Sequence, residues 1–353
     1  CYKASGQLDA AVESFEKALA IKPDYTEVCY NLGIVFMGLG QLDEAVKSYE
    51  KALTLKPNYA EAHYNLGIAF KKLGQLDTAV EHYEKAIAIQ PDYAEAHNNL
   101  GNVLNDLGQL DDAVKSYEKT LTLKPNYAEA HNNLGNAFKK LGQLDDAVKS
   151  YEKTLTLKPD DAETYSNLGI VYMQLNQTDV ALKCYKKALA IKPDYADAHA
   201  NRGNAMKRLE RMDEAMASYE LAIALDPELV FILGDIYYTK MHLCIWDDLA
   251  SHLNELVNKI NNGEKVLNPF PLLAMIDDPE IQRKAAEIYA NEKYPQSHVL
   301  SRIERYPKHK KVRIGYFSQD FRNHPVARLT AELYEIHDRE RFEIHAFSFG
   351  PDT

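Results

Sequence analysis

The chain has 353 residues, of which 46% are hydrophobic and 26% are charged, and its formal net charge is −11. That length suits two domains, or one long repeat array joined to a second unit. Acidic and basic residues are interspersed, which argues against a general nucleic-acid binder, and no apolar run approaches the about 18 residues of a membrane span.

The cysteines and the start of the chain indicate its setting. The four cysteines have no metal-ligand spacing, so we expect free thiols in a reducing, cytoplasmic compartment: Cys1, Cys29, Cys184 and Cys244. Cys29 and Cys184 fall on predicted packing faces. Because the sequence begins part-way through a repeat and without Met, we expect it to be a piece of a longer protein.

A period of 34 residues dominates the first two thirds of the chain, and seven prolines mark it: Pro23, Pro57, Pro91, Pro125, Pro159, Pro193 and Pro227. Within one period, apolar residues at helical spacing predict two helices, Ala94–Leu107 and Leu110–Leu123. Gly108 suits the left-handed end of the first helix, and Pro125 ends the second. Gly101 lacks a side chain and lets the paired helix approach closely.

This pattern resembles the tetratricopeptide repeat family, whose period is 34 residues and whose marker positions are occupied by Leu100, Gly101, Leu104, Ala113, Tyr117 and Pro125. The resemblance implies a mainly α fold, a right-handed α-α superhelix with a concave groove for polypeptide substrates or partner proteins. We predict one superhelix over residues 1–262, composed of a partial repeat (1–25), six full repeats (26–229) and a degenerate capping repeat (230–262). The last contains predicted helices Val230–Leu243 and Asp247–Ile260.

The remaining sequence divides into a joining segment and a different fold. Residues 263–310 predict two helices, Pro269–Met275 and Pro279–Asn291, and Tyr294–Lys311 is a basic connector. Its short basic run, Lys308–Lys311, favours a solvated connector over a phosphate site. Residues 311–353 then predict strand Val312–Ser318, helix Val326–Ile336 and strand Phe342–Phe349. Strand, helix, strand is the start of a parallel, Rossmann-like α/β domain, which we expect to be incomplete here.

Several motifs resemble the O-linked N-acetylglucosamine transferases. KVRIGYFSQDFRNHP at 311–325 and RFEIHAFSF at 341–349 resemble the opening of their catalytic region, and CIWDD (244–248) with NPFPLL (268–273) resembles their joining segment. The resemblance implies a two-lobed glycosyltransferase that moves N-acetylglucosamine from UDP-N-acetylglucosamine to Ser or Thr of proteins. A related branch transfers fucose, and these residues do not separate the two.

The resemblance places the nucleotide-sugar site mainly in a second lobe. We therefore expect this chain alone to be inactive and to carry no cofactor, with UDP-N-acetylglucosamine as the donor of the full-length enzyme. We expect the protein in the cytoplasm, and also in the nucleus if the source is eukaryotic. The rival interpretation is a non-enzymatic tetratricopeptide scaffold for protein–protein interaction. The sequence predicts neither the oligomeric state nor the protein substrates.

His324 is the candidate catalytic residue. It precedes Pro325, after a strand whose carboxyl end is where α/β sheets place ligands, and by resemblance it matches the family's active-site Asn-His-Pro motif. A histidine there can accept a proton, and the structural alternative is a loop histidine that caps the following helix. Ser318, Asp320 and Asn323 share the turn, as positioning residues or as ordinary turn residues, and their order matches no nucleophile elbow of a hydrolase.

One asparagine recurs at the same position of every full repeat, and the six are candidates for peptide binding: Asn31, Asn65, Asn99, Asn133, Asn167 and Asn201. Stacked repeats are about 10 Å apart and an extended peptide advances about 3.3 Å per residue, so one amide could bind backbone at every third residue or so. The resemblance also implies such an asparagine ladder. The alternative is that each amide bonds only to the neighbouring helix.

Two further ladders favour structural roles. The acidic ladder consists of Glu27, Glu61, Glu95, Glu129, Glu163 and Asp197. The resemblance implies that acidic residues here contact substrate side chains. However, the spacing from Asp92 to Glu95 and from Asn126 to Glu129 is that of a capping box, which favours a structural role. The second ladder is His63, His97, His131 and His199. A spacing of about 10 Å per repeat excludes a shared zinc, whose bonds to nitrogen are about 2.0 Å, so we expect packing.

Overall fold

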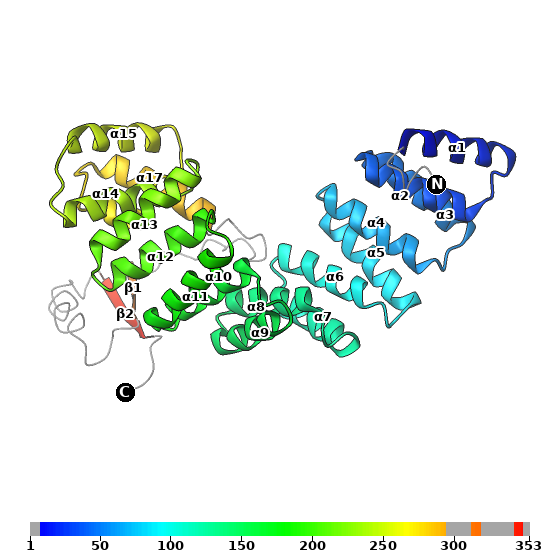
Figure 1. Cartoon of the computed structure of the whole chain (residues 1–353), viewed down its shortest axis with the longest axis horizontal. Coiled ribbons are helices and arrows are strands. Elements are labelled where there is room, and N and C mark those ends of the chain that lie inside the picture. The colour runs from blue at the N-terminus through cyan, green and yellow to red at the C-terminus, as the bar shows by residue number, and fades with distance from the viewer. Residues whose placement is uncertain (1–7, 294–311, 319–341, 349–353) are drawn as a thin grey trace. The chain divides into compact units, whose positions relative to one another are not determined.

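The computed structural model describes residues 8–293, 312–318 and 342–348. The chain forms two compact units, Cys1–Tyr294 and Pro295–Thr353. Over its described residues the first unit contains helices and no strand, and successive helices follow one another in chain order (Figure 1). None of the helices described is both long and apolar enough to cross a membrane.

The first unit begins with one leading helix and six helix pairs, as the repeats predict. The helices are α1 Leu8–Ile21, α2 Thr26–Leu39, α3 Leu42–Leu55, α4 Ala60–Lys72, α5 Leu76–Ile89, α6 Ala94–Asp106, α7 Leu110–Leu123, α8 Ala128–Leu141, α9 Leu144–Leu157, α10 Ala162–Gln174, α11 Thr178–Ile191, α12 Ala196–Arg208 and α13 Met212–Leu225. The prediction for α7 is confirmed at both ends, and α6 stops one residue before its predicted end.

Small and aromatic residues make the two helices of each repeat fit together. The second helix of every full repeat buries a tyrosine ring against the glycine of the first helix, as Tyr117 does against Gly101. An alanine of the second helix is fully buried beside it, as at Ala113. The close approach predicted from Gly101 is confirmed, because a side chain at that position would overlap the ring.

The turn inside each repeat needs a left-handed residue. Gly108 has φ 76° after α6, which confirms the prediction, and glycines occupy the same place in the first four full repeats. In the last two full repeats Asn176 and Glu210 take that conformation, with φ 61° and 59°. A left-handed backbone is tolerated by asparagine but is unfavourable for glutamate, so Glu210 is the strained one of the two.

The predicted capping boxes are wrong. Helices α6 and α8 begin one residue later than those boxes require, so that Tyr93 and Tyr127 are the N-cap residues and no side chain caps either helix. Asp92 and Asn126 therefore lie outside the capping position.

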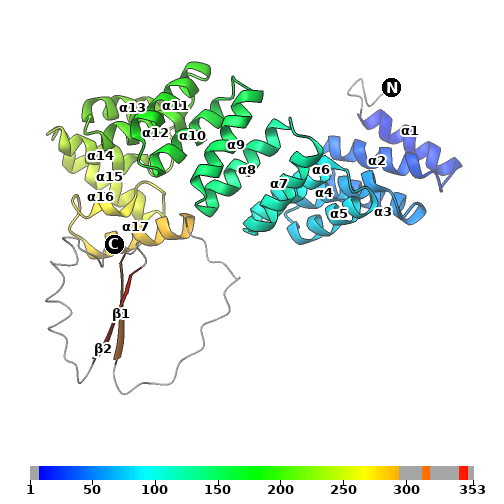
Figure 2. The same cartoon turned by 90° about the horizontal axis from the view of Figure 1, so that it is seen from below.

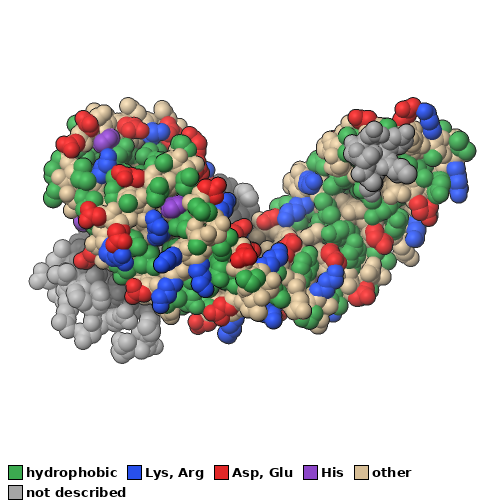
Figure 3. All heavy atoms as spheres, in the orientation of Figure 1, with side chains coloured by type: hydrophobic (Ala, Val, Ile, Leu, Met, Phe, Trp, Pro, Cys, Tyr) green, Lys and Arg blue, Asp and Glu red, His purple; other side chains and the backbone are tan. Residues whose placement is uncertain are grey.

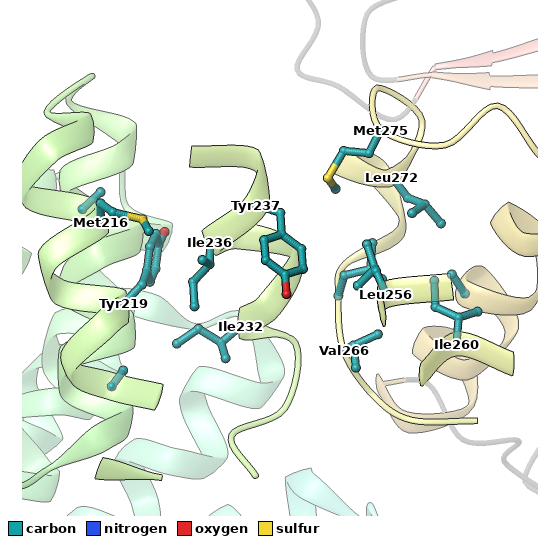
Figure 4. Packing of buried hydrophobic residues seen from close by; sticks show 14 of the residues in the cluster. Met216, Tyr219, Ile232, Ile236, Tyr237, Leu256, Ile260, Val266, Leu272 and Met275 are labelled. Atoms are coloured by element: carbon teal, nitrogen blue, oxygen red, sulfur yellow. The ribbon is translucent and has the colours of Figure 1, made fainter. Parts of the chain in front are cut away.

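A separate core closes the C-terminal end of the array. It joins α13 to α14 (Ile232–His242), α15 (Leu249–Asn261), α16 (Pro269–Leu272) and α17 (Pro279–Lys293). Figure 4 shows Ile232 and Ile236 of α14 on the side that faces Met216 and Tyr219 of α13. Together with Tyr237, Leu256, Ile260, Val266, Leu272 and Met275 they belong to one buried cluster. The four helices lie close to their predicted ranges, with α16 shorter.

The second unit contains two parallel strands within its described residues. Strands β1 (Val312–Ser318) and β2 (Phe342–Ser348) pair in register from Val312 with Phe342 to Ser318 with Ser348 (Figure 2). Both strands lie where the sequence predicts them. The predicted helix over residues 326–336 lies outside the described residues.

Candidate functional site

The first helices of the repeats form one continuous surface, which we call the first-helix face. Helix α2 contacts α4, α4 contacts α6, and the same relation continues through α8, α10 and α12. Each of the six predicted asparagines lies on one of these helices and is half-buried. Side chains on this face are therefore in line from repeat to repeat, although the first helices are far apart in sequence.

Two of the asparagines donate a hydrogen bond to a tyrosine of the preceding repeat. Asn65 Nδ2 lies 2.9 Å from Tyr30 Oη, and Asn99 Nδ2 lies 3.0 Å from Tyr64 Oη. Each amide has a second N–H and a carbonyl oxygen, for which no partner is found among the described residues. The amides thus link neighbouring repeats and still present one donor and one acceptor.

The next two asparagines bond differently. Asn133 Nδ2 donates to Asn102 Oδ1 at 2.9 Å, with Asn98 Oδ1 at 3.4 Å, and Asn167 Oδ1 accepts from Lys139 Nζ at 2.9 Å. Asn31 and Asn201 make no side-chain hydrogen bond within the described part of the chain. Four of the six amides thus support the repeat stack, while the two outermost are available to a ligand.

The middle of the first-helix face is lined by amides. This amide band comprises Asn99 and Asn102 of α6 and Asn132, Asn133 and Asn136 of α8, whereas Asn98 is fully buried and donates to Glu129. Buried tyrosines fix part of it from below, because Tyr117 Oη donates to Asn102 Oδ1 and Tyr151 Oη donates to Asn136 Oδ1, at 2.8 and 2.7 Å. An amide whose oxygen is held in this way keeps its N–H groups as donors.

The acidic ladder is open to solvent. Its members on α2, α4, α8, α10 and α12 are exposed, and none of them caps a helix. Glu95 is half-buried and is bonded to Lys124, which lowers the pKa of that carboxyl. Acidic and basic side chains are mixed over the rest of the surface that Figure 3 shows.

The histidine ladder has a structural role that sequence reasoning described only as packing. In each of the four repeats that contain this histidine, its Nε2 faces the carbonyl oxygen of the proline six residues earlier, at 2.9 Å from His131 to Pro125 and 3.2 Å from His97 to Pro91. A carbonyl only accepts, so Nε2 carries the proton. No group of three or more potential metal ligands occurs among the described residues.

One histidine contact was not predicted. His63 Nδ1 lies 3.1 Å from His82 Nδ1, and the His82 ring stacks on Phe70 with ring centres 5.3 Å apart. Because His63 Nε2 donates to Pro57, its Nδ1 must accept, and His82 is the donor. Burial lowers the pKa of His82 to about 4, and His63 and Lys85 add to that effect.

A cavity of about 280 Å³ lies where the last full repeat meets α14 and α17. Asn201, Asp235, Phe231 and Lys293 are among its lining residues. Phe231 has the left-handed φ of 65°, its N–H bonds to Lys265, and its ring meets Tyr289 edge-on. A phenylalanine in this conformation has no sequence signal.

The predicted catalytic elements lie mostly outside the described residues. His324, Asp320 and Asn323 are not among them, and Ser318 ends β1 without a described side chain. Their roles therefore stay predictions.

Comparison with known proteins gives matches to three family models, two of repeats and one of a glycosyltransferase. Six successive matches to the family described as TPR repeat together span residues 2–210, and residues 196–229 match a tetratricopeptide repeat model. The family described as glycosyl transferase family 41 matches residues 286–353.

A curated relative and two solved structures are similar over parts of the chain. The probable UDP-N-acetylglucosamine–peptide N-acetylglucosaminyltransferase SEC of Arabidopsis thaliana is 31% identical over 130 residues, which are 33% of this chain and 13% of that protein. The Cut9–Hcn1 structure of the APC/C matches with a TM-score of 0.54 and 19% identity, covering 67% of this chain and 46% of that one. A tetratricopeptide repeat protein of Parabacteroides merdae matches with a TM-score of 0.52 and 20% identity, covering 64% of this chain and 89% of that one.

The two structural matches show the fold alone, and the chain spans about an eighth of the curated relative's length. The repeat matches, in contrast, extend over more than half of the chain and agree with the helix pairs described above. The chain therefore belongs to the tetratricopeptide repeat family, and it resembles the O-linked N-acetylglucosamine transferases.

Proposed function

We propose that this chain is the substrate-binding repeat region and the beginning of the catalytic region of a protein O-glycosyltransferase. The enzyme would move N-acetylglucosamine from UDP-N-acetylglucosamine to Ser or Thr hydroxyls of proteins, in the cytoplasm or nucleus. The observation that carries this proposal is the match to glycosyl transferase family 41 over residues 286–353, on the C-terminal side of the repeats. The similarity to the Arabidopsis protein supports the same donor and acceptor.

The first-helix face would hold an extended part of the protein substrate. Repeats stack about 10 Å apart, so an extended chain would meet one ladder asparagine at about every third residue. Asn65 and Asn99 each retain a donor and an acceptor after bonding to the preceding repeat, which matches the acceptor and donor of a peptide backbone. Backbone recognition of this kind would accept many sequences.

His324 would act at the acceptor hydroxyl, and the α/β segment would be the start of a Rossmann-like lobe. A histidine can accept the hydroxyl proton as the Ser or Thr oxygen attacks the sugar, since its ordinary pKa is near neutrality. Ser318, Asp320 and Asn323 would position that ring or the substrate. The nucleotide sugar would be held by residues beyond this first βαβ unit.

Transfer of labelled sugar by the complete gene product tests the proposed activity. We expect incorporation of N-acetylglucosamine from the labelled UDP sugar into a Ser/Thr-containing protein, and a loss of about a hundredfold or more on His324→Ala, the usual scale for a general acid–base residue. Incorporation of fucose from its nucleotide sugar would show that the donor is not UDP-N-acetylglucosamine. If the complete gene product transfers no sugar, the function would instead be that of a non-enzymatic scaffold for protein–protein interaction.

Peptide binding is tested separately on the 353-residue chain. The side chains of Asn31 and Asn201 make no hydrogen bond to a neighbouring helix within the described residues. Replacing both by Ala should therefore weaken binding of an unstructured polypeptide without lowering the melting temperature. The matched pair, Asn99→Ala with Asn133→Ala, also removes bonds between repeats and should lower both. Unchanged affinity in the first pair would show that the ladder serves only the repeat stack.

A further inference from the structure

Two copies of one aromatic arrangement lie on the first-helix face, one repeat apart. The rings of Tyr30 and Tyr59 have centres 4.9 Å apart and planes inclined by 39°. Tyr64 and Tyr93 repeat that geometry at 4.8 Å and 35°. All four side chains are half-buried. We call them the paired tyrosines; each pair presents ring surface that the fold leaves partly open.

The arrangement is confined to the N-terminal part of the face. At the position of Tyr30 and Tyr64, the later repeats have Asn98, Asn132, Ser166 and Ala200. Tyr195 occupies the position of Tyr59 and Tyr93 but has no aromatic partner there. The face is therefore aromatic over α2–α6 and amide-lined beyond it, so one ligand segment meets two kinds of surface.

Each pair also carries a hydrogen-bond donor. The hydroxyl oxygens of Tyr30 and Tyr64 accept from the ladder asparagines Asn65 and Asn99. A tyrosine hydroxyl that accepts one bond keeps its own O–H to donate. Every pair thus combines ring surface with a donor directed by the neighbouring amide.

We propose that the paired tyrosines bind a polypeptide segment in the polyproline II conformation, with prolines three residues apart. The proposal rests on the proposed polypeptide binding by the repeats and specifies the chemistry of the bound segment. Polyproline II has 3 residues per turn and a rise of about 3.1 Å, so one turn advances about 9 Å. Stacked helices are separated by about 8–10 Å, so one turn matches one repeat.

The identity of the two pairs selects this conformation over a β-strand. A strand alternates its side chains between two faces with a period of two. At three residues per repeat, a strand would direct one side chain toward the first pair and away from the second. A polyproline II helix directs the same face toward both, which two identical aromatic pairs require.

Proline fits the surface for two further reasons. Aromatic-lined grooves bind proline-rich segments because the segment is already ordered before binding, which reduces the entropy lost. Polyproline II also has no internal hydrogen bonds, so its carbonyls remain free for the tyrosine hydroxyls and the second N–H of the ladder asparagines. A proline nitrogen has no hydrogen to leave unpaired.

The test uses two fluorescein-labelled peptides of one composition, with three prolines either three or four residues apart in a Ser/Ala background. Fluorescence anisotropy with the 353-residue chain should show about tenfold tighter binding of the first peptide, as expected for the gain of one or two aromatic contacts. Equal affinities would overturn the proline inference and leave polypeptide binding standing. Absence of binding by both would overturn polypeptide binding as well, while the sugar-transfer assay remains independent.

A matched pair of variants locates the site. Tyr93→Leu removes one ring of a pair, whereas Tyr195→Leu changes the equivalent N-cap residue of α12, which has no aromatic partner. We expect Tyr93→Leu to abolish the preference between the peptides and Tyr195→Leu to retain it, with equal helical circular dichroism. Retention of the preference in Tyr93→Leu would overturn the assignment.

Discussion

The ring of Tyr117 occupies the space that a side chain on Gly101 would need: an added Cβ would lie 2.6 Å from Tyr117 Cε1. Because Tyr117 is buried and its hydroxyl is bonded to Asn102, the ring cannot move aside freely. The same contact recurs in every full repeat, so the fit of the two helices depends on it.

We therefore expect Gly101→Ala to lower the free energy of unfolding by about 1–3 kcal/mol, the usual cost of overpacking. Gly108→Ala is the control, since its position has open space around it and only the left-handed φ to oppose the methyl group, at a cost of about 1 kcal/mol. Urea denaturation followed by circular dichroism measures both. A larger loss in Gly108→Ala would show that backbone strain outweighs the tyrosine contact.

Introducing glycine at the left-handed turn position should stabilise the sixth full repeat. Glu210 adopts φ 59° where the earlier repeats have glycine, so Glu210→Gly relieves strain and should raise stability by up to about 1 kcal/mol, offset in part by the entropy of glycine. Gly142→Glu makes the reverse change in the fourth repeat and should lower stability. Thermal melting followed at 222 nm compares them, and a fall in melting temperature for Glu210→Gly would contradict the assignment of strain.

The ion pair of Lys207 and Asp235 joins the last full repeat to the closing core. The two atoms Nζ and Oδ1 are 2.5 Å apart, and the side chains are only 25% and 19% exposed. Asp235→Asn leaves a half-buried ammonium without its partner and should cost about 1–3 kcal/mol. The exposed pair Lys115–Asp112 is the control, with a loss below about 1 kcal/mol for Asp112→Asn. Similar losses in chemical denaturation would show that burial adds nothing to the pair.

The contact between His63 and His82 predicts a stability that depends on pH. The folded-state pKa of His82 is about 4 and the ordinary value is 6.5, so below pH 6.5 the unfolded chain binds a proton that the folded chain does not. Stability is therefore complete above pH 6.5, falls between pH 6.5 and 4 by up to about 3 kcal/mol, and changes no further from this group below pH 4.

Urea denaturation at pH 7, 5.5 and 4 measures this dependence. His82→Gln should flatten the curve in that interval, because it removes the titrating ring. His131→Gln leaves the His63–His82 contact intact and should keep the wild-type slope. An unchanged slope in His82→Gln would assign the acid sensitivity to other groups.

Much of the repeat region could be predicted because its period determines local structure. The bounds of α7 follow from a helical apolar pattern between Gly108 and Pro125, and both strands follow from their β-branched and aromatic residues. The capping boxes failed because α6 starts after Tyr93, which leaves Asp92 one residue before the capping position. A local motif cannot resolve a shift of one residue when tertiary contacts decide it.

The candidate site was predicted by position but not by bonding. The repeat places every ladder asparagine on the first-helix face, yet the partners of Asn65 and Asn133 depend on Tyr30 and Asn102, which differ between repeats. The His63–His82 contact joins a first helix to a second helix, and His82 is the one histidine at its repeat position. Such contacts need the packed helices, since no periodic signal marks them.

The helices α7 and α9 have the same sequence, LDDAVKSYEKTLTL, and make the same tyrosine-to-asparagine and threonine-to-carbonyl bonds to the helices before them. Removal of residues 110–143 would join α6 directly to α9 and recreate an interface that already exists, and Asn98 would replace Asn132 as the partner of Thr164. Unequal recombination within this part of the gene can therefore add or delete a whole repeat while keeping the pairing of first and second helices, although Asn105 would replace Lys139 and the bond to Asn167 would be lost. The length of the first-helix face, and with it the span of polypeptide that this face can hold, can therefore evolve while the fold of each repeat stays the same.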